Sequence, residues 1–343
     1  MENDVILKVE HLKQYFKMGR SVLKAVDDVS FEVKRGEVFG IVGESGCGKT
    51  TTGRSIIKLY DITGGDVWFK GQHISTGETD MRRRISQAKK AGRTEEAARL
   101  SAELKKNLSE VDAVKKQKIM TKMQMIFQDP VASLNPRMTV REIIAEGLTI
   151  RGVRDKKVID EAVQRSLEMV GLVSEHAERY PHEFSGGQRQ RIGIARAIVL
   201  EPELIIADEP ISALDVSIQA QVINLLNDLR RQMQLTLIFI AHDLSVVKYF
   251  SDRIAVMYYG KIVELAGSEE LFKHPLHPYT KALLSAIPLP DPYYEKQRRR
   301  ILYVPARDHD YGTEVPQLRE VSPGHFVSCS TAEFDAYRAI LEA

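Results

Sequence analysis

Eight consecutive residues have the spacing G-x-x-x-x-G-K-[ST] of a phosphate-binding loop, namely Gly43, Glu44, Ser45, Gly46, Cys47, Gly48, Lys49 and Thr50. The apolar run 37–42 before the loop predicts a buried strand, and residues 51–59 after it predict a helix. Glycines let the loop turn its N–H groups toward phosphates, and the helix N-terminus adds partial positive charge. We therefore expect Lys49 to reach the β- and γ-phosphates of a nucleoside triphosphate, with Thr50 on Mg²⁺ and Thr51 beside them.

A second apolar run, residues 204–207, ends in two carboxylates, Asp208 and Glu209. An unbroken apolar run is typical of a strand buried on both faces, and the carboxyl ends of such strands line the ligand crevice of α/β folds. We expect Asp208 to hold Mg²⁺, directly or through water, and Glu209 to polarise the attacking water. The alternative is a pair of solvated acids in a turn, which the phosphate loop in the same chain disfavours.

A serine and two glycines, Ser185, Gly186 and Gly187, stand with Gln188 before the helical run 192–200. A serine at a helix start predicts a second anion-binding helix N-terminus. Because it lies shortly before the acidic strand end, this segment resembles the signature motif of ATP-binding cassette (ABC) ATPases. The other motifs of that family fall in order at Gln128 in the Q-loop, Asp215 in the D-loop and His242 as the switch histidine. A lone histidine after a strand is usually structural, so the catalytic role of this one depends on the motif order.

The resemblance extends over nearly the whole chain outside about residues 78–120. Segments 127–136, 277–288 and 321–329 resemble the corresponding parts of ATPases that serve oligopeptide and dipeptide importers. The longest of these, residues 277–288, begins with the sequence His277-Pro278-Tyr279. The resemblance therefore reaches beyond the nucleotide-binding motifs into the C-terminal part of the chain.

The resemblance implies a fold and a domain plan. An ABC nucleotide-binding domain would occupy residues 1–272 and contain a helical signature subdomain at about 130–200. A C-terminal extension over 273–343 would be a satellite rather than a second core. Strands alternating with helices around a phosphate loop predict a mostly parallel sheet, so the expected class is α/β, with a RecA-like core and an antiparallel β subdomain within residues 5–33 and beyond.

For function, the resemblance implies an ATPase subunit that powers the import of short peptides. ATP and Mg²⁺ would bind the phosphate loop of one subunit, and the signature residues of another subunit would cap them. The expected partners are a paralogous ATPase in a heterodimer, two membrane permease subunits and, indirectly, an extracytoplasmic solute-binding protein, which places the chain on the cytoplasmic face of the membrane. In this family Glu209 would polarise water, His242 would contact the γ-phosphate, and Gln128 would sense Mg²⁺ while linking to the permeases.

Two alternatives remain open at this point. The cargo could instead be an oligosaccharide, nickel or another small solute, because the ATPase subunit does not touch it. A soluble ABC ATPase that acts on nucleic acid or ribosomes typically has two cassettes, long coiled coils or zinc insertions, whereas this chain has one cassette and a short hairpin. We therefore expect no nucleic-acid partner.

An aromatic residue of the first strand stacks on adenine in this family. Phe16 is the preferred candidate and Tyr15 the alternative, because strand alternation puts only one of two neighbours on the nucleotide side. For either ring alone, a place in the core of the sheet is equally compatible with the sequence.

Composition agrees with these expectations without deciding among them. A chain of 343 residues with a formal net charge of +2 gives no reason to invoke nucleic acid. No apolar run approaches the roughly 20 residues that span a bilayer, and the first four residues do not begin a secretory signal. Two cysteines argue for a reducing compartment, and we expect Cys47 to be a small filler rather than a reactive thiol.

Residues 81–122 contain thirteen Lys/Arg against five Asp/Glu, about +8 in a chain of net +2. Four apolar residues recur there at helical spacing: Leu100, Leu104, Leu108 and Val111. With a turn at 92–94, this pattern predicts a charged helical hairpin inserted at about 78–122. We favour a solvated hairpin, and the alternative is a docking surface for anionic headgroups or for a membrane-subunit loop. The family resemblance assigns this insertion no role.

The C-terminal extension contains one cysteine, Cys329, where many relatives have several that in some cases ligate an iron–sulfur cluster. A cubane cluster takes four cysteine ligands. His325 and Cys329 together would supply at most half of a zinc site. We therefore expect neither an iron–sulfur cluster nor zinc.

Overall fold

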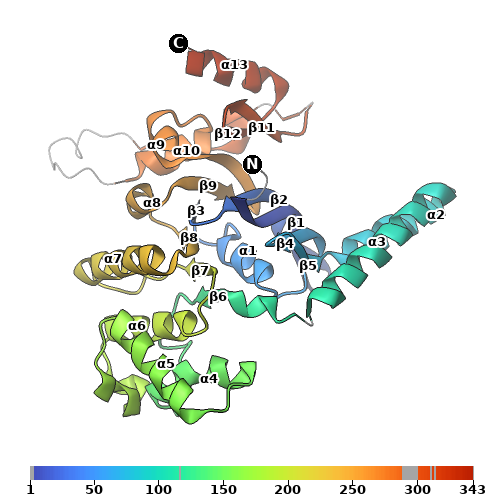
Figure 1. Cartoon of the computed structure of the whole chain (residues 1–343). Helices are drawn as coiled ribbons and strands as arrows, with labels where there is room; N and C mark the ends of the chain where they lie inside the picture. The colour runs from blue at the N-terminus through green and yellow to red at the C-terminus, as the bar shows by residue number, and fades with distance from the viewer. Residues whose placement is uncertain (1–3, 116, 288–299, 310, 313, 343) are drawn as a thin grey trace.

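The computed structural model describes residues 4–115, 117–287, 300–309, 311–312 and 314–342, so Pro288 lies outside the described residues (Figure 1). Its strands form a four-stranded sheet of order β2-β1-β4-β5 and an eight-stranded sheet of order β11-β12-β10-β9-β3-β8-β7-β6. The smaller sheet consists of β1 (Val5–Met18), β2 (Ser21–Lys34), β4 (Gly64–Phe69) and β5 (Gln72–Thr76). The larger consists of β3 (Val38–Val42), β6 (Met123–Ile126), β7 (Leu204–Asp208), β8 (Thr236–Ala241), β9 (Arg253–Tyr258), β10 (Lys261–Gly267), β11 (Gln317–Ser322) and β12 (His325–Cys329).

The centre of the larger sheet is parallel, as the sequence predicts. Strands β6, β7, β8, β3 and β9 pair in parallel, and every residue of β3, β7 and β8 is buried. Burial on both faces explains why these strands are continuous apolar runs. Val42 lies opposite Ala241, and Asp208 lies opposite Ile240. The three strands therefore end at one level, and the residues that follow each of them emerge at the same edge of the sheet.

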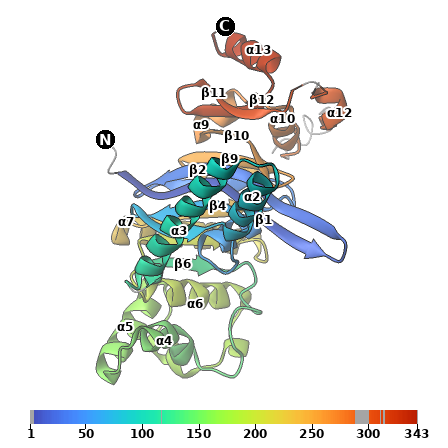
Figure 2. The same ribbon diagram turned by 90° about the vertical axis from the view of Figure 1, so that its right-hand side faces the viewer.

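Helices on both sides of this sheet connect the strands. They are α1 (Lys49–Ile56), α7 (Val216–Met233) and α8 (Leu244–Phe250). The helical subdomain contains α4 (Val140–Arg151), α5 (Lys156–Met169), α6 (Gly186–Ile198), η3 (Ser174–Glu178) and η4 (Pro181–Glu183). Both α4 and α6 begin with capping boxes, at Thr139 and Ser185. Figure 2 shows this subdomain at the opposite end of the molecule from the C-terminal extension.

The insertion is a helical hairpin, as predicted. It consists of α2 (Glu78–Lys90) and α3 (Thr94–Lys115), which project together from the body of the molecule (Figure 1), and η2 (Ile119–Lys122) leads from it to β6. A narrow apolar seam joins the two helices: Met81, Leu100, Leu104, Ile85 and Leu108. The base is integrated with the main fold, because Val114 belongs to the apolar cluster beneath the smaller sheet. The hairpin thus has a solvated outer part and an anchored base.

A histidine on β5 also fixes the base of the hairpin. His73 contacts Asp66 at 2.8 Å through Nε2 and Glu110 on α3 at 3.1 Å through Nδ1, and its ring stacks on Trp68. Burial alone would lower the pKa of His73, but its hydrogen bonds to the two carboxylates outweigh burial and raise the pKa. The insertion is therefore held to the smaller sheet by charge as well as by apolar contacts.

The C-terminal extension continues the larger sheet, which the sequence did not predict. Strand β12 pairs with β10 and β11 pairs with β12, both antiparallel. Its described helices are α10 (Pro278–Ser285), α12 (Pro305–Asp308) and α13 (Thr331–Glu342), and α9 (Ser268–Lys273) leads into it from β10. A small apolar cluster unites it: Leu276, Val321, Val327, Cys329 and Tyr337. Within the described ranges, no helix has both the length and the apolar character needed to cross a bilayer.

We predict that the outer hairpin is dispensable for folding and nucleotide binding. Replacing residues 83–102 by a short Gly-Ser turn removes Ile85 and Leu100 from the seam but leaves Val114 in place. Doubling a surface loop costs only about 0.6 kcal/mol, so the melting temperature and the nucleotide affinity should stay close to those of the intact chain. Thermal melts and nucleotide titrations of the purified chain test this.

The control is a deeper deletion, of residues 81–122. It also removes Val111 and Val114, and each buried valine contributes about 1.5–3 kcal/mol. We expect this variant to melt several degrees lower. Loss of nucleotide binding in the shorter deletion would show that the outer hairpin supports the cassette directly.

Candidate functional site

The segment between β3 and α1 has the backbone of a phosphate-binding loop. Gly43 has φ 152° and Gly48 has φ 109°, and a Cβ atom at either position would lie 2.2 Å from a backbone carbonyl oxygen, of Met257 and of Ala25 respectively. Glycine is required at both positions because the chain passes so close. Helix α1 begins at Lys49, two residues earlier than the sequence predicted, so its first N–H groups belong to the loop.

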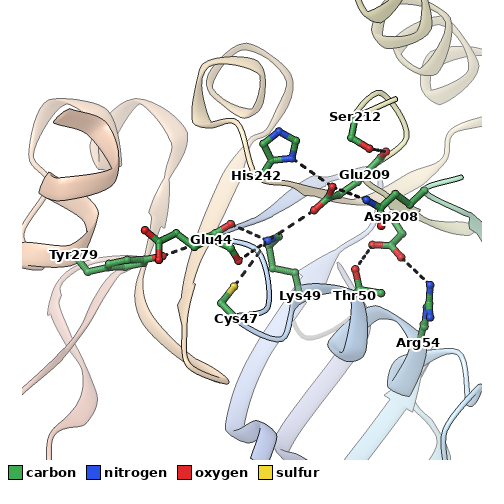
Figure 3. Close-up of polar contacts among 12 residues, drawn as sticks. Glu44, Cys47, Lys49, Thr50, Arg54, Asp208, Glu209, Ser212, His242 and Tyr279 are labelled. Carbon is green, nitrogen blue, oxygen red and sulfur yellow. Dashed lines mark hydrogen bonds and ion pairs between the residues drawn. The ribbon is translucent and has the colours of Figure 1, made fainter. Parts of the chain in front are cut away.

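The side chain of Lys49 lies inside the loop. Its Nζ donates to the carbonyl oxygens of Gly43 at 2.8 Å and Glu44 at 3.0 Å, and it lies 3.9 Å from Oε1 of Glu209 (Figure 3). The residue is buried. The ammonium group is thus partly neutralised by carbonyl dipoles and one carboxylate, which leaves the centre of the loop positive and suited to an anion.

Cys47 lies beside this ammonium group. Its Sγ is 3.9 Å from Nζ of Lys49, and burial raises the pKa of the thiol. A buried cysteine with a raised pKa is a poor nucleophile. This environment supports the expectation that Cys47 fills space in the loop.

Thr50 and Asp208 form an oxygen-rich pair beneath the loop. The Thr50 hydroxyl donates to Oδ1 of Asp208 at 2.7 Å, while Oδ2 of Asp208 has no hydrogen-bond partner in the described part of the chain and lies 3.7 Å from the Arg54 guanidinium (Figure 3). Asp208 is fully buried, and burial raises the pKa of its carboxyl against the opposing effects of Thr50 and Arg54. A hydroxyl and a buried carboxylate with a free oxygen are the hard ligands that a divalent cation such as Mg²⁺ takes.

The carboxylate of Glu209 contacts residues from three separate segments of the chain. Its Oε2 accepts from Nε2 of Gln128 at 3.1 Å and lies 3.4 Å from Nδ1 of His242, while its Oε1 faces Lys49. Its backbone has φ 43°, a left-handed conformation, and its N–H donates to the carbonyl of Ile240 on β8. The side chain of Gln128 therefore lies against Glu209 and not against the pair Thr50–Asp208.

The signature residues do not join this group. Ser185 caps α6 by accepting from the N–H of Gln188 at 3.3 Å, and the side chain of Gln188 accepts from the N–H of Ser185. Gly186 and Gly187 form the first turn. Across the described residues, no hydrogen bond or ion pair connects this helix start to the phosphate loop. Asp215 is exposed at the start of α7 and makes no side-chain capping bond.

The two candidate adenine rings have different neighbours. Phe16 packs edge-on against Tyr60, at a centroid separation of 5.3 Å. The Tyr15 hydroxyl donates to the carboxylate of Asp27, and its backbone N–H donates to Thr63. Tyr15 is therefore tied to polar partners, whereas the ring of Phe16 packs against another aromatic ring. The choice of Phe16 stays a prediction.

One residue at the loop was missed by sequence reasoning. The Tyr279 hydroxyl on α10 accepts from the backbone N–H of Glu44 at 3.1 Å, although 235 positions separate the two residues (Figure 3). The sequence marked 277–288 only as part of a family resemblance. No local pattern signals that a tyrosine so far along the chain returns to the loop.

In the C-terminal extension, the two residues considered for zinc have other environments. His325 lies 2.8 Å through Nε2 from Oε1 of Glu264, and both side chains are buried. Cys329 is a buried free thiol, and burial raises its pKa to about 11. The absence of zinc and of an iron–sulfur cluster stays a prediction.

Comparisons with known sequences agree with this geometry. The sequence model of the family described as ABC transporter matches residues 26–107 and 94–212, and that of the oligopeptide/dipeptide transporter C-terminal region matches residues 263–312. The oligopeptide transport ATP-binding protein OppF of Bacillus subtilis (strain 168) is 56% identical over 333 residues, covering 97% of this chain and 98% of that protein. The dipeptide transport ATP-binding protein DppF of Lactococcus lactis subsp. cremoris (strain MG1363) is 49% identical over 337 residues, covering 97% of this chain and 96% of that protein.

Solved structures show the same fold. The dimeric post-hydrolysis state of the ATP-binding cassette MJ0796, bound to ADP and Pi, has a TM-score of 0.60 and 27% sequence identity. The match covers 77% of this chain and 99% of that chain. The predicted α/β fold of the P-loop cassette is thereby confirmed.

The environment of Asp208 generates a stability prediction. Its folded pKa is raised above the unfolded value, so the free energy of unfolding falls as pH rises from the unfolded pKa through the folded one. Asp208→Asn keeps the acceptor for Thr50 and removes the buried charge. We expect this variant to melt at a higher temperature than the parent near pH 7–8 without nucleotide, and the gain should shrink toward acidic pH. Thermal melts across pH check this, and a lower melting temperature at pH 7–8 would contradict it.

Proposed function

The chain belongs to the ABC transporter family, among the ATP-binding subunits for oligopeptides and dipeptides, and from this premise we propose that it hydrolyses ATP to drive the import of short peptides. The convergence of Lys49, Gln128 and His242 on the Glu209 carboxylate beside the phosphate loop is the observation that carries the proposal. The printed functions of the two bacterial relatives support peptides as the cargo.

The phosphate loop binds ATP in this proposal. Lys49 exchanges part of its contact with the loop carbonyls for the β- and γ-phosphates, and the N–H groups at the start of α1 face the same anion. Thr50 and Asp208 hold Mg²⁺, which neutralises charge on the phosphates when bound. The Oδ2 of Asp208 supports this assignment, because it accepts no hydrogen bond from the described residues. Phe16 stacks on the adenine.

Glu209 acts as the group that orients and polarises the attacking water. Its carboxylate is only slightly exposed and lies between Lys49 and His242, so it faces the place where the terminal phosphate would lie. His242 contacts the γ-phosphate, and Gln128 moves between Glu209 and the cation as the site fills. The contact between Gln128 and Glu209 supports a sensing role, because occupying the site must break or shift it.

A second ATPase subunit completes the site. Ser185, Gly186, Gly187 and Gln188 bind the nucleotide of the opposing subunit, and Asp215 lies at the interface between the two subunits. This arrangement is supported by the lack, among the described residues, of any hydrogen bond or ion pair between the start of α6 and this chain's own loop. The partner is a paralogous ATPase in a heterodimer, and two permease subunits dock near Gln128 and the exposed Val131. The chain therefore works at the cytoplasmic face of the membrane, and an extracytoplasmic binding protein delivers the peptide.

Glu209→Gln tests the proposal directly. The change keeps the size of the side chain but removes the carboxylate, so hydrolysis by the assembled transporter should fall on the order of 10²–10⁴-fold while ATP binding persists. Uptake of labelled peptide into proteoliposomes should fall with it. Glu203→Gln is the matched control, because Glu203 precedes β7 and pairs on the surface with Lys70 and Arg35. Wild-type turnover in Glu209→Gln would remove this carboxylate from the mechanism.

Lys49→Ala should weaken nucleotide binding itself. A charge-assisted hydrogen bond contributes about 1.5–3 kcal/mol, so the dissociation constant for ATP should rise on the order of ten- to a hundredfold. Equilibrium titration with a fluorescent ATP analogue measures this. Lys70→Ala, in the turn between β4 and β5 where Lys70 pairs with Glu203, is the control and should bind like the parent. Unchanged affinity in Lys49→Ala would contradict the assignment of the loop.

A further inference from the structure

The first peptide unit of the phosphate loop is held at both ends. Its carbonyl, on Gly43, accepts from Nζ of Lys49 at 2.8 Å, and its N–H, on Glu44, donates to the Tyr279 hydroxyl at 3.1 Å (Figure 3). A peptide plane rotates as one body, so whatever fixes the N–H also fixes the carbonyl. Tyr279 therefore controls the orientation of an atom that anchors Lys49.

Tyr279 is itself firmly placed. It is 2% exposed, and its ring packs against Tyr258 at 4.4 Å and against Tyr303 at 5.5 Å between centroids. Its own N–H donates to Nδ1 of His277, the N-cap of α10, at 3.1 Å. Burial lowers the pKa of His277 to about 3, so the ring is neutral and its Nδ1 can accept this bond.

A buried carboxylate fixes the start of α10. Glu264 on β10 is fully buried and accepts from the backbone N–H groups of Leu276 at 2.8 Å and His277 at 3.1 Å. The same carboxylate contacts His325 on β12 at 2.8 Å. A continuous series of hydrogen bonds thus runs from the extension strand β12 through Glu264 and α10 to the phosphate loop.

From these contacts we infer that Tyr279 is a positioning residue for ATP hydrolysis, through which the C-terminal extension sets the geometry of the phosphate loop. This inference rests on the proposed function. Tyr279 touches neither phosphate nor water and acts by orienting the Gly43–Glu44 peptide and, through it, the ammonium group of Lys49. Small misplacements of a positioning group have large effects on rate, so the contact favours the reactive arrangement of the phosphates.

Tyr279→Phe is the test, because it removes the hydroxyl and keeps the ring. Loss of one neutral hydrogen bond corresponds to about a three- to tenfold change in an equilibrium. We expect ATP affinity to fall by that factor and ADP affinity by less. AMP affinity should not change, because Lys49 faces only the distal phosphates. The matched control is Tyr303→Phe, in the same aromatic cluster, whose hydroxyl makes no hydrogen bond to another described residue; it should leave all three affinities unchanged.

A double mutant separates positioning from a general loss of structure. If Tyr279 acts through Lys49, adding Tyr279→Phe to Lys49→Ala should lower ATP affinity no further than Lys49→Ala alone. The inference is overturned if Tyr279→Phe lowers ATP affinity in the Lys49→Ala background by the same factor as in the parent. It is also overturned if Tyr279→Phe lowers the affinities for ATP, ADP and AMP equally, or leaves ATP affinity unchanged. If Lys49→Ala itself leaves ATP affinity unchanged, the proposed function fails first. If Lys49→Ala lowers ATP affinity while Tyr279→Phe binds ATP like the parent, this inference is overturned and the proposed function stands.

Discussion

The parallel register of β3, β8 and β7 is the constraint on which the site depends. Because the three buried strands end at one level, the loop after β3, the carboxylates at the end of β7 and the histidine after β8 emerge together. A shift of β7 by one residue would turn Asp208 to the other face of the sheet and exchange it with Ala207. The apolar side chains that fix this register are therefore as necessary to the chemistry as the polar ones.

Within that frame, Glu209 combines an unfavourable backbone conformation with a carboxylate that is only slightly exposed. It lies at the end of a buried strand in a left-handed conformation, which for a residue other than glycine costs on the order of 1–3 kcal/mol. The bond from its N–H to Ile240 holds the backbone in this state. Contacts with Lys49 and His242 offset the hydration that this carboxylate loses by being partly buried. In this conformation the carboxylate lies against Lys49 of the phosphate loop and His242 after β8.

The sequence predicted those features of the fold and the site that depend on a local pattern of residues. The spacing of the loop glycines, the acids after an apolar run and the turn at 92–94 each have a local physical cause, and the structure places all of them as expected. The contacts of Gln128 with Glu209 and of Tyr279 with Glu44 join segments far apart in the chain, and no periodicity encodes them. The same holds for the pairing of β12 with β10, since the sequence of a short strand in a polar segment does not indicate which strand it pairs with. The neighbours of Tyr15 and Phe16 likewise required the fold.

The pairing of β12 with β10 changes the meaning of the boundary near residue 272. In sequence this boundary separates a cassette from an appended region, but in the fold one sheet crosses it. Glu264, before the boundary, forms its hydrogen bonds with Leu276, His277 and His325, which all follow it. A fully buried carboxylate is tolerated only where hydrogen bonds replace its lost hydration. Loss of the extension would thus leave Glu264 without its main partners, and Tyr279 without a fixed start for α10. The extension is for this reason part of the structure that forms the phosphate loop, and not a satellite attached to a complete cassette.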